Sequence, residues 1–574
     1  MHITGKEAQS AVNPPIVIII ARLHHLGQCR NDQEAALALE ATWQGIDTAL
    51  AANDMLGAAV IAEAMLARGE RHPMLLNLAA WRKEEAGEFA SAHILLAEAQ
   101  TLAPNDPLIQ LSVGAVMRKE GRLNEALATF AKVAPLVADN PAYWLERGYA
   151  YEASGALEAA AADFEKSVAL DPNSAPPLAA LASVLARLGR IEAACMAAKR
   201  ACALDRYNPT ALIAEARCDL EAGAFASARD RLITLTTRTD VHIADRVIAL
   251  GLLGDAHDRL GNSAEAFAAY AAAYTSFRVQ HAARFGPERK EPPQSAFIAS
   301  IGAALSNINP DLWGVSVACP AQARGHVFLL GYPRSGTTLV ENILASAEGV
   351  EALEERPTLI DVDRVFLENE GGLAHLAALN QAETQPYVDA YWAQVARFGI
   401  TPAAKLFVDM DPLKGIKLPL IAKLFPSARI IIMRRDPRDV VWSCFRTNFA
   451  LSAAAWEFTT LEATAHHYDA LMRLTEQCLA TLPLTVHQLY YDALVSDFDT
   501  TTQALCKFLD LEWSPALRAF DKTAQRRGVT TASSGQVRKG LYDGTRQWQR
   551  YAAQMESVLP ILQPWVERFG FDQG

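Results

Sequence analysis

The sequence predicts an α-solenoid of paired helices, followed by an α/β domain with a central parallel sheet. Glycines recur every 34 residues through the first half, and apolar runs alternate with helical patterns through the second. A glycine-bounded loop also separates a strand pattern from a helix pattern at residues 326–339. We therefore expect a repeat array at 1–278 (clearest at 53–241), a linker at 279–325 and a C-terminal domain at 326–574.

The repeat array is predicted from two kinds of small residue at a fixed phase. The glycines suit left-handed turns, and Asn53 extends their series one step earlier. An alanine follows each glycine by five residues, where a small side chain lets two helices approach closely. The two series are Gly87, Gly121, Gly155, Gly189, Gly223 and Ala92, Ala126, Ala160, Ala194, Ala228. Because one helix pair cannot bury its apolar face alone, neighbouring pairs must stack into a concave superhelix.

This pattern resembles the tetratricopeptide-repeat family from residue 72 to about residue 241, and a looser unit continues to about residue 278. The resemblance implies a surface that binds a protein or peptide. The alternative is that the array only shapes or dimerises the rest of the chain, so an oligomer is possible. The sequence singles out no residue of the concave face.

Bulk properties exclude several classes of protein. A net charge of −12 gives nucleic-acid binding no overall electrostatic support. The eight cysteines include no Cys-x-x-Cys pair, which argues against a disulfide scaffold and a zinc site and favours a reducing, cytoplasmic location. The apolar run at 14–21 is too short to span a membrane and makes a poor secretory signal, so we expect it to pack on the first repeat.

The loop at 326–339 is the strongest chemical signal in the chain. Its backbone N–H groups and the positive end of the following helix form an anion site. The loop is P-loop-like, but Thr337 stands where the nucleotide-phosphate pattern has lysine, and Arg334 supplies a cation earlier in the loop. The predicted anion-binding residues are Arg334, Ser335, Gly336, Thr337 and Thr338.

A second anion-binding pattern follows about 100 residues later. The predicted strand Arg429–Met433 is followed by Arg434 and Arg435, and Asp436-Pro437 is a typical helix start. Arg435 and Ser443 together offer a guanidinium fork and a neutral donor for a phosphate.

Pro333-Arg334-Ser335-Gly336-Thr337-Thr338-Leu339 resembles the 5′-phosphosulfate loop of the sulfotransferases, and most of residues 326–570 resembles that family. The family includes tyrosylprotein sulfotransferases and bacterial repeat-containing enzymes. The resemblance implies 3′-phosphoadenosine-5′-phosphosulfate (PAPS) as donor, an acceptor hydroxyl and no metal.

Further roles are implied by the same resemblance. Arg435 and Ser443 match the residues that bind the donor's 3′-phosphate, with Arg446 as a possible addition whose placement differs slightly. Tyr491 matches a tyrosine near the adenosine, although packing at a strand end explains it equally well. In the closing loop, Ser533 lies by the transferred group, and the nearby cations are Arg538, Lys539 and Arg546.

The general base is expected just beyond the helix that follows the anion loop. The tyrosylprotein-type family has a glutamate pair at this distance and uses its second member, which implies Glu355, with Glu354 as substitute. The alternative is an exposed acidic loop before a helix near Pro357. His375 lies too far along to match the histidine base of the small-molecule sulfotransferases.

Sulfuryl transfer requires both reacting ends to be positioned, the leaving phosphate to be stabilised and the acceptor proton to be accepted. The predicted catalytic residues are Glu355, Arg334 and Ser533. The chain departs from the family at Met410, where a lysine often stands. Either Lys414 or Lys417 reaches in instead, or the enzyme is slowed, or donor use has changed.

Three hypotheses follow. The first is a PAPS-dependent sulfotransferase whose array recruits a protein or peptide acceptor; tyrosine is plausible, and a glycan or small hydroxylated metabolite is nearly as plausible. The second is a repeat scaffold with a catalytically degenerate nucleotide-binding domain. The third, an ATP-using kinase, is disfavoured because the chain lacks Gly-Lys-Ser/Thr and an acidic magnesium motif.

Overall fold

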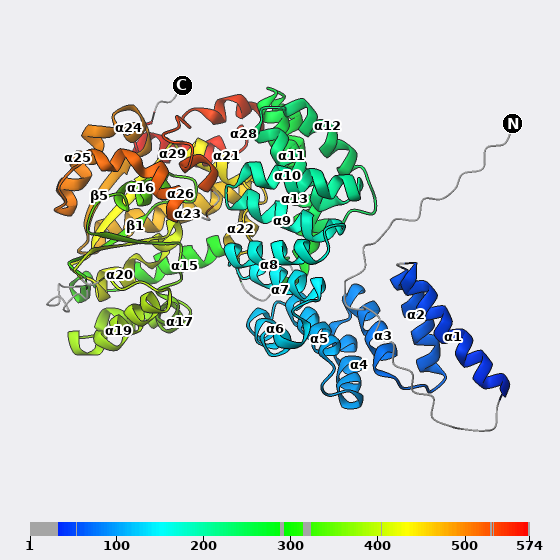
Figure 1. The fold of residues 1–574 in the computed structure, drawn as a ribbon. Coiled ribbons are helices and arrows are strands. Elements are labelled where there is room, and N and C mark those ends of the chain that lie inside the picture. Colours follow the sequence, from blue (N-terminus) through cyan, green and yellow to red (C-terminus); the bar gives the residue numbers. More distant parts are fainter. Residues whose placement is uncertain are drawn as a thin grey trace. The chain divides into compact units, whose positions relative to one another are not determined.

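The computed structural model describes most of the chain as two compact units, residues 1–224 and 225–574 (Figure 1). The described residues are 33–52, 54–286, 292–313, 323–402, 404–527, 531 and 533–571. The apolar run at 14–21 and Asn53 lie outside them. Among the described residues, no helix is long and apolar enough to cross a membrane.

The first unit consists of helices joined by short turns. They are α1 (Gln33–Ala51), α2 (Met55–Ala67), α3 (Pro73–Glu85), α4 (Phe89–Leu102), α5 (Pro107–Lys119), α6 (Leu123–Val137), α7 (Pro141–Ala153), α8 (Leu157–Leu170), α9 (Ala175–Arg187), α10 (Ile191–Leu204) and α11 (Pro209–Glu221). The 34-residue glycine series forms the turns within the pairs, with φ from 74° to 82°, and the following alanines are buried. The predicted helical repeat is confirmed.

Glycines within the first helix of two pairs, separate from the turn glycines, explain how closely the paired helices pack. A Cβ on Gly114 would lie 2.4 Å from the ring of Phe130, and one on Gly148 would lie 2.5 Å from Phe164. In both pairs an aromatic ring of the second helix lies on bare backbone of the first. The same contact recurs in the second unit, between Gly254 and Tyr270.

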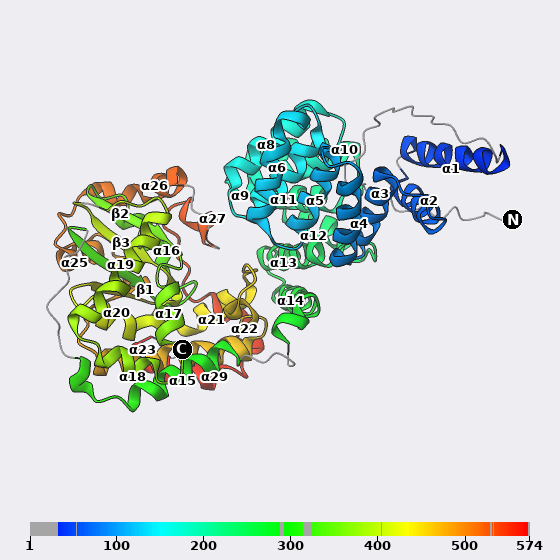
Figure 2. The ribbon, with the colours of Figure 1, turned by 90° about the horizontal axis from the view of Figure 1, so that it is seen from below.

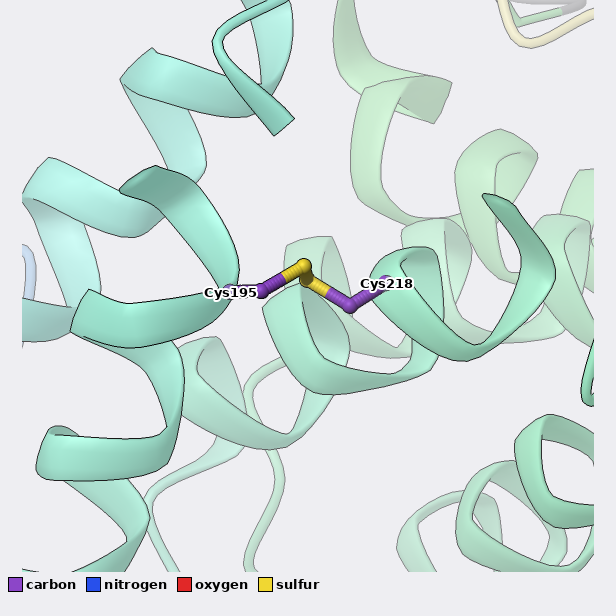
Figure 3. Close-up of a disulfide and its surroundings, with 2 residues drawn as sticks. All are labelled: Cys195 and Cys218. Carbon is purple, nitrogen blue, oxygen red and sulfur yellow. A yellow bond between two sulfur atoms is a disulfide. The ribbon is translucent and has the colours of Figure 1, made fainter. Parts of the chain in front are cut away.

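Cys195 of α10 and Cys218 of α11 form a disulfide, with their Cα atoms 5.7 Å apart (Figure 3). The sequence argued against a disulfide scaffold and did not predict this bond. The two positions are 23 residues apart in sequence, and they meet because α10 and α11 pack against each other. Only the packing of successive repeat helices brings such a pair together.

The second unit begins with helices and continues into a sheet. Its leading helices are α12 (Phe225–Thr236), α13 (Ile243–Arg259), α14 (Ser263–Phe285) and α15 (Gln294–Ser306). Helix α15 lies in the segment expected to be a linker, yet Ile298, Ile301 and Leu305 are buried in the same core as the sheet. The contacts thus divide the chain at 224/225, and the boundaries at 278 and 325 stay predictions.

Five parallel strands form the sheet, in the order β2-β3-β1-β4-β5. They are β1 (Gly325–Leu330), β2 (Val350–Glu354), β3 (Leu406–Met410), β4 (Arg429–Arg434) and β5 (Thr485–Tyr490). Side chains alternate between two cores: Val327 and Leu329 face one, and Phe328 and Leu330 face the other. The predicted α/β class with a central parallel sheet is confirmed.

Helices cover both faces of the sheet (Figures 1 and 2). One core includes residues of α16 (Thr337–Leu344), α25 (Phe498–Leu509) and α26 (Phe520–Arg527). The other includes residues of α17 (Ile360–Phe366), α18 (Gly372–Ala378), α19 (Gln381–Arg397), α20 (Leu418–Leu424), α21 (Pro437–Arg446), α22 (Ala453–Glu457), α23 (Leu461–Thr481), α28 (Ala552–Met555) and α29 (Leu559–Arg568). The shorter helices α24 (Tyr491–Ser496) and α27 (Ser534–Val537) lie near the carboxyl edge described below.

Helix α14 packs on α21, the helix that follows β4, and α13 packs on α14 (Figure 2). The hydroxyl of Tyr274 donates to the carbonyl oxygen of Thr447 at 2.7 Å. Asp258 of α13 is buried and forms an ion pair with Arg446 at 3.3 Å and with Arg550 at 3.0 Å. The last helical hairpin therefore belongs to the core of the second unit.

Two glycines of α13 provide a matched test of this packing. Gly254→Ala should lower the stability of the second unit by about 1–3 kcal/mol, because its Cβ would lie 2.4 Å from the ring of Tyr270. Gly251→Ala should raise stability by about 0.5–1 kcal/mol, since nothing lies within 4 Å of its added Cβ and alanine favours the helix. Thermal unfolding measures both, and equal shifts would contradict the close contact.

Candidate active site

The carboxyl ends of four neighbouring strands meet at one edge of the sheet, where ligands bind in open α/β folds. The loop after β1, the end of β2, the end of β3 and the start of α21 after β4 all lie there. The predicted loop at 326–339 and the predicted Arg435 pattern are therefore brought together by the topology.

The anion loop has the strained backbone that its sequence suggests. Arg334 and Gly336 have positive φ of 70° and 107°, and α16 begins directly afterwards at Thr337. Gly336 is constrained twice, because a Cβ there would also lie 2.9 Å from the ring of Tyr491. Thr337 and Thr338 are buried, and the hydroxyl of Ser335 accepts from the N–H of Tyr332 within the loop.

Arg334 is the centre of a hydrogen-bond network that joins three segments. Its Nε donates to Ser443 of α21 at 3.0 Å, and its other nitrogens donate to Ser533 at 2.6 Å and to Gln536 at 2.8 Å. The side chain is buried, and burial lowers the pKa of Arg334 to about 10, with Arg446 and Arg435 adding to the shift. The side chain of Arg334, in the loop, thus contacts predicted site residues of both α21 and the closing loop.

Arg435 lies beside this network. It donates to the carbonyl oxygens of Arg334, at 2.7 Å, and of Gly544, and it stacks on the ring of Tyr491 at 4.7 Å. Its Nε is buried without a hydrogen-bond partner among the described residues. Tyr491 donates to the carbonyl oxygen of Tyr542, so it lies at the site and not only in strand-end packing.

The segment 531–548, which we call the strap, covers this edge. The hydroxyls of Thr531 and Thr338 are 3.2 Å apart, and the Thr531 N–H donates to Glu354 at 3.3 Å. At the other end of the strap, Asp439 of α21 accepts from the N–H groups of Arg546, at 2.7 Å, and of Trp548, at 2.9 Å. A small cleft remains beneath the strap, lined by Arg334, Gly336, Leu339, Arg435, Tyr491, Ser533, Gln536, Val537, Gly540 and Tyr542.

The remaining predicted cations are placed differently. Arg538 is half-buried, burial lowers its pKa, and the charge of Glu354 opposes that shift. Lys539 is exposed on the strap. Arg446 forms an ion pair with Asp258 of α13, although its charge still influences Arg334.

Glu355 lies at the carboxyl end of β2 with a positive φ of 42°, and its N–H donates to the carbonyl oxygen of Met410 at 2.7 Å. Glu355 is exposed, as are Arg356 and Pro357, which fits the alternative of an exposed acidic loop. Even so, partial burial of its carboxyl group among neighbouring protein atoms raises the pKa of Glu355 to about 8. Carboxylates of Asp411, Glu354 and Glu341 add to this shift, and Arg334 opposes it.

Neither expected substitute for the family lysine reaches toward the loop. Met410 is buried in an apolar core. Lys414 is fully buried, pairs with Asp409 and donates to the carbonyl oxygen of Arg356 at 3.1 Å. Lys417 pairs with Asp363. Lys414 instead braces the backbone next to Glu355.

Several residues of this edge were not predicted from sequence. Gln536 and Tyr542 lie on the strap, whose course no periodic pattern reveals. Asp439 accepts a hydrogen bond from the N–H of Arg546 on the strap, 107 residues later in the chain. Among the described residues, no group of His, Cys, Asp and Glu could hold a metal ion.

The comparisons with known proteins agree with this geometry. Residues 326–515 match the sulfotransferase family. Residues 141–174 match the tetratricopeptide repeat, so both family resemblances are confirmed.

The relatives found by sequence are distant. An uncharacterised protein of Aquifex aeolicus is 28% identical over 42% of this chain, and the alignment spans only 33% of that protein. Protein-tyrosine sulfotransferase 1 of Danio rerio is 23% identical over 50% of this chain and 81% of its own. A tetratricopeptide-repeat structure from Thermus thermophilus is 21% identical, with a TM-score of 0.29, and covers 32% of this chain and 98% of its own.

The strap should depend on Asp439. Asp439→Ala removes the acceptor of two backbone N–H groups, so trypsin should cleave at Arg538, Lys539 or Arg546 faster than in the parent. Asp543→Ala is the control, because Asp543 bonds only to Thr545 within the strap among the contacts described. Equal cleavage of the parent and Asp439→Ala would show that the strap is held elsewhere.

Proposed function

We propose that the C-terminal domain is a PAPS-dependent sulfotransferase that moves a sulfuryl group to an acceptor hydroxyl. The observation that carries this proposal is the contact of Arg334 with both Ser443 and Ser533. It unites the residues assigned to the donor's 5′-phosphate, its 3′-phosphate and the transferred group. The charge of Arg334 also acts on Glu355.

In this mechanism, PAPS supplies the sulfuryl group, and the chain's residues bind and orient it. Arg334 and the N–H groups at the start of α16 stabilise the leaving 5′-phosphate, while Arg435 and Ser443 hold the 3′-phosphate. Ser533 lies by the transferred group. Glu355 accepts the proton of the acceptor hydroxyl, for which a raised pKa is suitable. Arg538 and Lys539 cover the nucleotide from the strap.

The acceptor and its recruitment are a finer part of the proposal. The resemblance to protein-tyrosine sulfotransferases supports a peptide tyrosine, and a glycan or small hydroxylated metabolite remains an alternative. We propose that the repeat array binds the acceptor protein or a partner. A cytoplasmic location stays a prediction, and the Cys195–Cys218 disulfide counts against it.

One observation favours the second candidate, a scaffold with a degenerate nucleotide site. Met410 cannot neutralise charge, and Lys414 and Lys417 are held by Asp409 and Asp363. Losing one stabilising contact typically lowers rate by about 10²–10³-fold. Such a scaffold would bind nucleotide and transfer nothing.

The proposal is tested by binding and transfer together. Calorimetry with adenosine 3′,5′-bisphosphate should give heat, ATP should compete weakly, and labelled PAPS should label acceptors in a cell extract. Glu355→Gln should slow transfer at least about 10²-fold and keep nucleotide binding, because it removes only the base.

The control and the contrary outcomes are distinct. Glu348→Gln makes the same charge change at an exposed position and should leave transfer unchanged. If adenosine 3′,5′-bisphosphate gives no heat of binding, PAPS is not the donor. Binding of the nucleotide without sulfuryl transfer would favour the scaffold hypothesis. Sulfuryl transfer by Glu355→Gln at the parent rate would refute the assignment of Glu355 as the base.

The pH dependence follows from Glu355. A base with a pKa of about 8 is mostly protonated at neutral pH, so kcat/KM should rise with pH and level off above about 8. Asp411→Asn should move this rise to lower pH, because Asp411 adds to the shift, and asparagine can still cap Leu413. A profile that is flat between about pH 6 and 9 would contradict the assignment.

A further inference from the structure

Arg527, the last residue of α26, joins two elements at the carboxyl edge of the sheet. Its guanidinium donates to Glu341 at 2.7 Å and to Asn342 at 3.1 Å, both in α16. The same guanidinium donates to the carbonyl oxygen of Ala352 in β2 at 2.9 Å. Glu341 and Asn342 are fully buried, so Arg527 contacts the helix from inside the protein.

These two elements carry opposite ends of the proposed reaction. Helix α16 begins at Thr337, one turn before Glu341, and its first turn faces the proposed donor phosphate. Strand β2 ends at Glu354, so Ala352 lies three residues before Glu355. Within the described sheet, no backbone hydrogen bond joins these two elements, because β2 pairs with β3. Arg527 therefore provides a direct polar link between the anion helix and the base strand.

The ion pair between Arg527 and Glu341 contributes little to stability, which argues that it has another role. Burial raises the pKa of Glu341 to about 7, with Arg527 opposing the shift and Glu354 adding to it. The second carboxyl oxygen of Glu341 is buried and has no hydrogen-bond partner among the described residues. Buried ion pairs contribute little net stability, since the cost of removing both charges from water offsets their attraction. A pair of this kind fixes geometry instead.

We propose that Arg527 is a positioning residue that sets the separation between the donor-phosphate helix α16 and the base Glu355. This inference rests on the proposed function. In-line transfer requires reacting atoms about 3–3.5 Å apart, and a displacement of about 1 Å costs about 10²-fold in rate. Arg527 contacts α16 one turn beyond its donor-binding start and makes no contact with the loop or α21 among the hydrogen bonds described, so donor affinity should change much less than the transfer rate.

The test separates transfer from binding. Arg527→Gln should lower kcat about 10–100-fold and change the Kd for adenosine 3′,5′-bisphosphate less than about threefold. Arg527→Lys should restore part of kcat, because it keeps the charge but not the fork that reaches both elements. Arg526→Gln is the matched control, since it makes the same change at the exposed neighbouring position.

Hydrogen exchange gives a second readout that needs no acceptor. The Glu355 N–H donates to Met410, so exchange of the peptide covering 350–355 should be faster in Arg527→Gln and unchanged in Arg526→Gln. If Arg527→Gln does not fold, Arg527→Lys supplies the same comparison.

The outcomes distinguish this inference from the proposed function. Parent-like kcat and exchange in Arg527→Gln would overturn it. Parallel loss of nucleotide binding and transfer would also overturn it, because it would show a general structural role. If the parent binds nucleotide but transfers nothing, the proposed activity fails, and the exchange comparison alone decides whether Arg527 positions β2.

Discussion

The guanidinium of Arg334 is the contact on which the candidate site depends. It reaches Ser443 on α21 and Ser533 on the strap, and its carbonyl oxygen accepts from Arg435. Burial lowers the pKa of Arg334 most, because it removes the charged guanidinium from water, and repulsion from Arg446 and Arg435 lowers it further. A dianionic ligand would relieve that repulsion, so the same cluster that is unfavourable alone is well suited to bind phosphate.

The opposite side of the edge has the opposite charge. Glu355 lies among carboxylates of Asp411, Glu354 and Glu341, which favour its protonated form. Arg334 follows β1 and Arg435 follows β4, whereas Glu355 follows β2 and Asp411 follows β3. Glu341 belongs to α16, which follows β1. The charge gradient across one sheet edge follows the direction that sulfuryl transfer requires: an anion stabilised at one end and a proton accepted at the other.

Sequence reasoning succeeded where the signal is local. The glycine series and the branched residues of β4 are patterns within one element, and they predicted the repeat and a central strand of the sheet. Strands β2 and β3 were not predicted, because each has five residues and includes a charged side chain. Asp409 is compatible with a buried strand because Lys414 pairs with it and the hydroxyls of Thr358 and Tyr391 donate to it, and these partners lie on different elements. Arg527 escaped notice for the same reason, since its partners lie about 175 to 186 residues away.

The last helical hairpin shows why a repeat pattern does not mark the end of a structural unit. The period of 34 residues records how helices pair, whereas a boundary lies where contacts between segments become few. Helices α13 and α14 continue the repeat pattern, yet Tyr270 and Phe267 pack against Trp442 of α21, and Asp258 is bound by Arg446 and Arg550. Helix α21, which carries Ser443, therefore packs in one core with the sheet and this hairpin. The final repeat is thus part of the framework of the candidate site.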